Sequence, residues 1–131
     1  MDKPEDESEW KTRKQRIDPR LDARGWPRRR GVGSGSAFRT EEEETENGPA
    51  DYALWLDDAI AGIVEAKRLS VGPQGALVQA ERYARGLPNS PFNFRGLRVP
   101  FLYSTNGTTI RFHDVRDEFN VSREVADFHT P

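Results

Sequence analysis

Apolar and aromatic residues gather in two short runs in the middle of the chain, at 51–56 and 59–66. Asp57 and Asp58 separate the runs, and aspartate favours turns because its short side chain hydrogen-bonds to the local backbone. Two apolar runs of this length around a two-residue turn are typical of antiparallel strands. The pattern therefore predicts a β-hairpin.

A second hairpin is predicted further along the chain. Residues 99–104 and 108–113 flank Asn106 and Gly107. Asparagine followed by glycine is the residue pair that best tolerates the positive φ angles of a tight hairpin turn. This is the strongest local signal for secondary structure in the sequence.

A helix is predicted over residues 8–24. Ser8 is a suitable N-cap, because its hydroxyl can accept a hydrogen bond from a free backbone N–H of the first turn, and Gly25 favours helix termination. Pro19 lies inside this pattern and lacks a backbone N–H, so a kink or a break is expected near Asp18. Two short helices satisfy the same pattern.

Another helix is predicted over residues 73–86, between the two hairpins. Pro73 suits the first turn of a helix, and Gly86 suits its end. The apolar positions recur at helical spacing, at Ala76, Leu77, Ala80, Tyr83 and Ala84. Helix, hairpin, helix and hairpin in this order predict an α/β (α+β) fold, with one mixed β-sheet flanked by helices.

The segment between the first helix and the first hairpin offers few residues for a core. It is basic, then rich in glycine and serine, and then acidic at Glu41–Glu44. We therefore interpret 27–50 as a flexible loop between an N-terminal helical segment, 1–26, and a catalytic core, 51–131. The glutamates are interpreted as part of a solvated loop. The alternative is a gate that repels DNA until a partner moves it.

Length and composition narrow the possible functions. A chain of 131 residues has the size of one domain, and 34% hydrophobic with 32% charged residues is typical of a water-soluble protein. The sequence contains no run of about eighteen apolar residues and no signal-peptide pattern, so a cytoplasmic location without a membrane partner is expected.

Cysteine is absent and the two histidines are isolated, so a metal would be held by carboxylates. The net charge of −2 neither favours nor excludes DNA binding.

Three residues of the first predicted hairpin can form a catalytic site. Side chains alternate along a strand, so Glu65 and Lys67 project from one face. Asp51 begins the partner strand and lies opposite the end at which Glu65 sits. Two facing carboxylates repel each other, and Mg²⁺ can stabilise such a pair. Mg²⁺ can also polarise a phosphodiester while an ammonium group stabilises negative charge, which is nuclease chemistry.

The same residues resemble the core motif of the PD-(D/E)xK nuclease superfamily. Asp51 is followed, after a gap of thirteen residues, by Glu65, Ala66 and Lys67. The proline that usually precedes the aspartate is replaced by Ala50. A Glu-x-Lys triplet by itself is common in proteins, so the resemblance depends on the residues around it.

That context resembles one branch of the superfamily. Gln79 and Tyr83 lie four residues apart, on one face of the predicted helix, and resemble the Gln-xxx-Tyr extension of type I restriction R subunits and RecB-like nucleases. The stretches IVEAKR, QAERYARGL, PFLYSTNG and FHTP also resemble the N-terminal domain of R subunits. The resemblance covers most of residues 8–131 and implies a restriction-endonuclease-like core.

The resemblance implies one group of five catalytic side chains: Asp51, Glu65, Lys67, Gln79 and Tyr83. Of these, the two carboxylates would ligate Mg²⁺, with the backbone carbonyl of Ala66 as a further ligand. The lysine would position the attacking water or stabilise charge, and the glutamine and tyrosine would orient the DNA strand or the lysine. Glu9, on the first helix, is an additional candidate metal ligand whose spacing fits the family only roughly.

The resemblance also implies a function and partners. The chain would be a type I site-specific deoxyribonuclease domain that hydrolyses double-stranded DNA, working with a motor domain and with methyltransferase and specificity subunits. No GxxxxGK motif occurs, so ATP would act only through a helicase domain absent from this chain. Two alternatives remain: a non-catalytic docking or DNA-binding module with the same fold, and a RecB-like or resolvase-like nuclease.

Overall fold

The fold is built around one mixed β-sheet. The computed structural model describes residues 8–28, 37–68 and 74–131. Within these ranges the strands follow one another across the sheet in chain order: β1 (Ala37–Thr45), β2 (Gly48–Leu56), β3 (Ala59–Ala66), β4 (Phe101–Thr105), β5 (Ile110–Asp114) and β6 (Arg123–Val125). The β3–β4 pair is parallel, and the other neighbours are antiparallel. The predicted mixed sheet flanked by helices is therefore confirmed.

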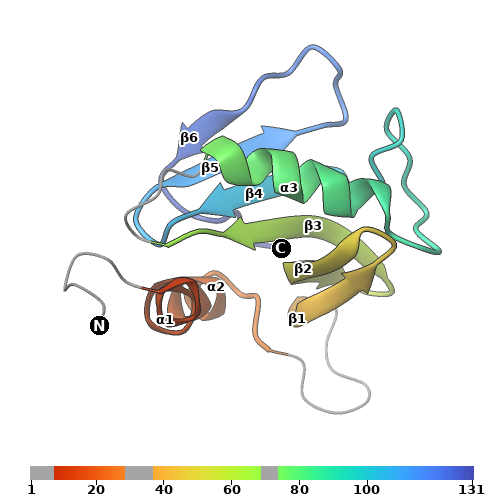
Figure 1. The fold of residues 1–131 in the computed structure, drawn as a ribbon. Helices are drawn as coiled ribbons and strands as arrows, with labels where there is room; N and C mark the ends of the chain where they lie inside the picture. Colours follow the sequence, from red (N-terminus) through yellow and green to blue (C-terminus); the bar gives the residue numbers. More distant parts are fainter. Residues whose placement is uncertain (1–7, 29–36, 69–73) are drawn as a thin grey trace.

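The parallel pair requires a crossover, because its two strands run in the same direction. Helix α3 (Gln74–Arg85) provides the crossover and crosses one face of the sheet, as Figure 1 shows. The predicted helix over 73–86 thus matches α3 closely. Its apolar side packs on β2, β3 and β4 in one core cluster that includes Leu77, Ala80, Ala53 and Ile63.

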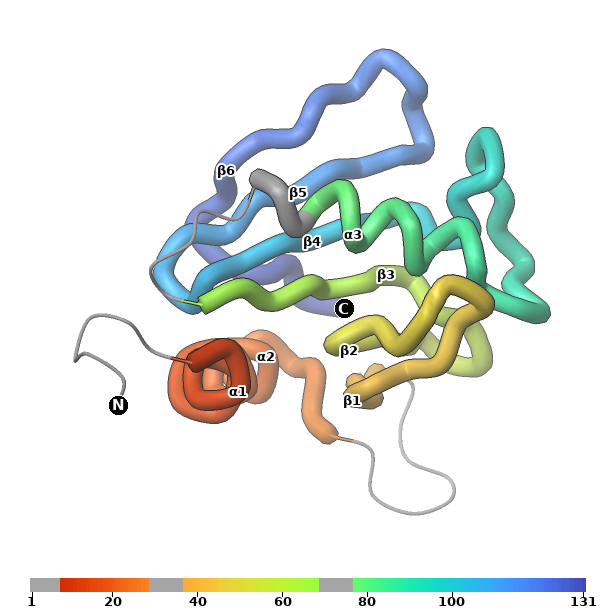
Figure 2. Tube along the Cα trace, viewed as in Figure 1, coloured from red at the N-terminus to blue at the C-terminus, as the bar shows by residue number. Residues whose placement is uncertain are grey.

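The N-terminal helical segment covers part of the opposite face. Figure 2 shows it beside the strands, with α1 (Glu9–Thr12) and α2 (Asp18–Ala23) nearly superposed along the view. Ile17 and Leu21 are fully buried there against Tyr52 and Val64. Both faces of the sheet therefore carry a hydrophobic core.

The first helix accommodates Pro19 without breaking. Ser8 caps α1 as predicted, because its hydroxyl oxygen accepts a hydrogen bond of 3.1 Å from the backbone N–H of Lys11. Between α1 and α2 the chain adopts a wider π-helical turn, η1 (Arg13–Ile17), and the N–H of Asp18 donates to the carbonyl of Arg13. The irregular turn thus lies directly before the proline, where a kink or break was predicted.

The interpretation of 27–50 as a flexible loop is wrong for the residues that the structure describes. Strand β1 and the first residues of β2 fall in this segment and form an antiparallel hairpin, whereas residues 29–36 lie outside the described part. Thr45 pairs with Gly48 across a two-residue turn, and Gly48 has a φ of 112°. Strand β1 is the edge strand of the sheet, where charged residues are common, and its outer side carries an isolated parallel bridge between Arg39 and Arg28.

The two predicted hairpins are confirmed. Strands β2 and β3 flank Asp57 and Asp58, and β4 and β5 flank the Asn-Gly turn. In that turn the Asn106 side-chain oxygen accepts the backbone N–H groups of Thr108 and Thr109, and Gly107 has a φ of 93°. Among the described residues, no helix has the length and apolar character needed to span a membrane.

Candidate active site

Asp51 and Glu65 lie next to each other on the paired strands β2 and β3. The backbone N–H of Asp51 donates to Glu65 Oε1 at 2.9 Å, and the backbone N–H of Ala66 donates to Asp51 Oδ2 at 2.8 Å. The two residues are 9% and 5% exposed. By strand alternation, Glu65 projects on the side of Ile63, which packs beneath α3. The hairpin register therefore brings the two predicted carboxylates together.

The two carboxyl groups strongly perturb each other. Burial, and next the charge of Asp51, raises the pKa of Glu65 to about 9. Burial also raises the pKa of Asp51, although the N–H of Ala66 and the guanidinium of Arg13 oppose that rise. Two buried carboxylates so close together repel each other, which favours the neutral form of Glu65. In the absence of a cation, the site thus keeps a proton on this pair well above the usual carboxyl range.

Lys67 and Glu9 extend this pair into a larger charged cluster. Lys67 follows β3 directly, its side chain is half-buried, and its backbone N–H donates to the carbonyl of Thr105 at 2.9 Å. Glu9 begins α1, and its pKa is raised by burial and then by Asp51, and lowered by Lys67. The first helix therefore brings the carboxylate of Glu9 into the electrostatic reach of Asp51.

Tyr83 approaches the cluster from α3. Its side chain is half-buried, and its pKa is raised by burial and then by the charges of Glu65 and Asp51. The backbone of Gly48 lies against its ring, since a Cβ built on this glycine would be 3.3 Å from the ring. Gln79 lies one helical turn earlier on α3 and is also half-buried. Tyr83 thus lies within electrostatic reach of Glu65 and Asp51, and Gln79 lies one helical turn away from Tyr83.

The donor chemistry of the cluster fits a hard divalent cation. Carboxylate oxygens are the ligands that Mg²⁺ prefers, and Mg²⁺ commonly uses only one or two of them while keeping several waters. Among the described residues, no three or more Asp, Glu, His or Cys side chains already surround one point closely enough to form a complete metal cage. A site built on Asp51 and Glu65, with water as the remaining ligand, is consistent with both facts.

Sequence reasoning missed the ion-pair network that joins α1 to β1. Arg13 is buried, and its guanidinium bonds to Glu41 and Glu42, while Lys14 Nζ lies 2.7 Å from Glu41 Oε1. The acidic run interpreted as a solvated loop thus binds basic residues of the first helix. The Asn47-Gly48 pair was a usable sequence signal for this hairpin, because the pair marks tight turns.

Comparisons with known proteins identify one family. The family described as type I restriction enzyme EcoKI endonuclease subunit, second domain, matches residues 34–131, about three quarters of the chain. The EcoKI endonuclease subunit of Escherichia coli is 28% identical over 131 aligned residues, which cover 70% of this chain and 11% of that protein. The chain thus spans only a small part of the curated relative that it matches.

A solved structure shares the fold. It is a fragment of a protein described as the HsdR subunit of a type I restriction enzyme from Vibrio vulnificus, with a TM-score of 0.73 and 24% identity. The match covers 94% of this chain and 24% of that one. The family match, the curated relative and the shared fold lead to one conclusion: this chain belongs to the family of the type I restriction enzyme endonuclease subunit domain.

Proposed function

We propose that this domain is the PD-(D/E)xK nuclease of a type I restriction R subunit and hydrolyses DNA phosphodiester bonds with Mg²⁺. One observation carries the proposal: the buried carboxyl groups of Asp51 and Glu65 lie together across the β2–β3 pair, each accepting a backbone N–H, and both have raised pKa values. Glu9 feels the charges of both Asp51 and Lys67. Buried like charges are destabilising unless a proton or a cation accompanies them. A divalent cation held by oxygen ligands meets that requirement and also serves phosphodiester chemistry.

Each residue of the cluster would have a distinct role. Asp51 and Glu65 would hold Mg²⁺, with the carbonyl of Ala66 and the carboxylate of Glu9 as further candidate ligands. When bound, Mg²⁺ would polarise the phosphodiester and lower the pKa of a water molecule. Lys67 would stabilise the negative charge that develops on the phosphate oxygens. Tyr83 and Gln79 would orient the DNA strand or the lysine from α3.

The wider assembly belongs to this proposal too. We infer that the domain cuts double-stranded DNA under the control of an ATP-dependent motor, with methyltransferase and specificity subunits choosing where and when. This assignment is supported by the relative from Escherichia coli, which is an endonuclease subunit of a type I restriction enzyme. The side chains of the cluster supply the chemistry of cleavage and leave base recognition to other parts of such an enzyme.

Replacing Asp51 by asparagine tests the proposal. We expect the variant to lose Mg²⁺ binding, measured by calorimetry, and to lose cleavage of covalently closed plasmid, because an amide oxygen carries no charge to hold the cation. Glu124→Gln is the matched control, since it removes one charge from an exposed position on β6, which lies three strands away from β3 in the sheet.

The Mg²⁺ affinities of these proteins distinguish a nuclease from a docking module. Wild-type protein and the control should bind Mg²⁺ equally, and the asparagine variant should not. Equal binding by all three would contradict the metal site and favour a non-catalytic module. If the isolated domain binds Mg²⁺ without cutting, the same substitution should be compared in a complete R subunit, because motor action is proposed to trigger cleavage. Methylated, unmethylated and branched duplexes then distinguish a restriction enzyme from a RecB-like or resolvase-like one.

A further inference from the structure

Arg13 is a buried arginine beside the proposed metal site, and the roles given above do not use it. Its Nη1 lies 3.7 Å from Asp51 Oδ1, and its Nη2 donates to the backbone carbonyl of Asp51 at 3.5 Å. It follows Glu9 by four residues, so both side chains reach Asp51 from one side of the same helix. A guanidinium in this position offsets the charge of Asp51 and would compete with a divalent cation for the same carboxylate.

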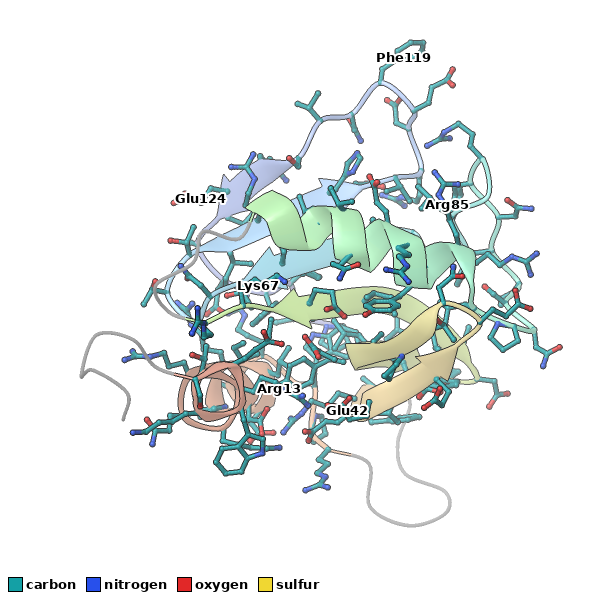
Figure 3. All side chains as sticks on the ribbon, viewed as in Figure 1. Arg13, Glu42, Lys67, Arg85, Phe119 and Glu124 are labelled. Carbon is teal, nitrogen blue, oxygen red and sulfur yellow. The ribbon has the colours of Figure 1, made fainter. Side chains whose placement is uncertain are left out.

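Two glutamates of β1 hold the same guanidinium more closely. Arg13 Nη2 donates to Glu41 Oε1 at 3.1 Å, and Nη1 donates to Glu42 Oε1. Figure 3 shows the labelled Arg13 and Glu42 close together between the first helix and β1. Both contacts are shorter than the contact to Asp51 Oδ1, so the edge strand is the main anchor of the arginine.

The backbone of β1 departs from strand geometry at Glu42, the second glutamate that binds Arg13. Successive side chains of a regular strand point to opposite faces, so Glu41 and Glu42 would not both reach one guanidinium. Glu42 has a φ of 53°, in the left-handed region, while pairing with β2 continues at Glu41 and Glu43 on either side. This local irregularity breaks the alternation and allows two adjacent carboxylates to bind Arg13.

We propose that Arg13 is the counter-cation of the metal site, and that Glu41 and Glu42 are positioning residues that hold it off Asp51 when a divalent cation binds. The proposal rests on the proposed function, because it concerns the same carboxylates. In the metal-free protein the guanidinium partly neutralises Asp51. When the cation binds, Glu41 and Glu42 keep the guanidinium of Arg13 in place. The carboxylate of Asp51 can then bind the cation without also pairing with the arginine.

Glu42→Gln tests the proposal, since the side chain of Glu42 is 57% exposed and its replacement leaves the core intact. The variant loosens Arg13, which then pairs more fully with Asp51. We expect the Kd for Mg²⁺ alone, measured by calorimetry, to rise about fivefold to tenfold, the range of a partly buried ion pair. Glu44→Gln removes the same charge from an exposed position of the same strand and should change Kd by less than about twofold.

A double-mutant cycle separates this role from a direct effect of charge, because the carboxylate of Glu42 also raises the pKa of Asp51. Arg13→Gln should bind Mg²⁺ at least as tightly as the wild type, and adding Glu42→Gln to it should change Kd by less than about twofold. An equal loss of affinity in both backgrounds would overturn the proposal. So would weaker binding by Arg13→Gln alone. If Arg13→Gln does not fold by circular dichroism, Arg13→Lys replaces it, since an ammonium lacks the planar, forked donors with which the guanidinium spans Glu41 and Glu42.

If the result is negative, Mg²⁺ binding by the wild type shows which of the two proposals has failed. No Mg²⁺ binding by the wild type would overturn the metal site, and the role of Arg13 with it. Normal binding by the wild type, together with equal affinities for Glu42→Gln and Glu44→Gln, would overturn only the role of Arg13. Weaker binding confined to Glu42→Gln, and absent in the Arg13→Gln background, would support both.

Discussion

Replacing Lys67 by alanine is expected to lower the rate of DNA cleavage by about 10²–10³-fold, the usual loss on removing one group that stabilises transition-state charge. Lys67 directly follows β3 and its backbone is fixed by the hydrogen bond to Thr105, so the side chain is presented from a rigid strand end. Plasmid cleavage under single-turnover conditions measures the effect. Because the lysine is not a proposed ligand, Mg²⁺ affinity should stay within about threefold of the wild type.

Lys11→Ala is the matched control for this prediction. Lys11 is exposed on α1, and its replacement removes the same charge and the same length of side chain. We expect the control to cleave at the wild-type rate. Unchanged cleavage in Lys67→Ala would remove the lysine from the active site. A parallel loss in both variants would point instead to general electrostatic attraction of DNA.

Replacing Glu65 by glutamine is expected to abolish cleavage and, in the absence of metal, to stabilise the fold at alkaline pH. The folded-state pKa of Glu65 is raised from 4.5 to about 9, chiefly by burial. The unfolded chain therefore loses this proton at lower pH than the folded one, so the carboxyl group destabilises the fold increasingly as pH rises from 4.5 toward 9. Glutamine removes this effect and can still accept the N–H of Asp51.

Urea unfolding in EDTA at pH 5 and pH 8 measures this second prediction. At pH 8 the variant should be more stable than the wild type by at least about 1 kcal/mol, and near pH 5 the difference should become much smaller. Added Mg²⁺ should stabilise the wild type but not the variant. Glu118→Gln, at an exposed loop position, should follow the wild type. A variant that is less stable than the wild type at pH 8 would contradict the raised pKa of Glu65.

Local signals were enough to predict most of the regular elements. The Asn106-Gly107 turn and the Asp57-Asp58 turn mark two hairpins because positive φ and aspartate turns depend on adjacent residues only. Helix α3 follows from the spacing of its apolar residues, which pack on the sheet as that spacing predicts. The register of the first predicted hairpin then placed Asp51 beside Glu65 correctly.

Strand β1 could not be predicted in the same way. Glutamate has a low preference for strands, and at Glu41 and Glu42 the strand gains its contacts from Arg13, which is 28 and 29 residues away in the sequence. For the same reason the arginine was not recognised as part of the site. Interactions of this kind become visible only when the helix and the edge strand are placed together in space.

The central claim is that Asp51 and Glu65 hold a divalent cation. The most direct measurement is anomalous scattering from crystals of this domain grown with Mn²⁺, which binds the same oxygen ligands as Mg²⁺. We predict a peak within about 2.0 to 2.6 Å of carboxylate oxygens from both residues, and its loss in crystals of Asp51→Asn. Crystals saturated with Mn²⁺ that show no peak between these two side chains would contradict the account.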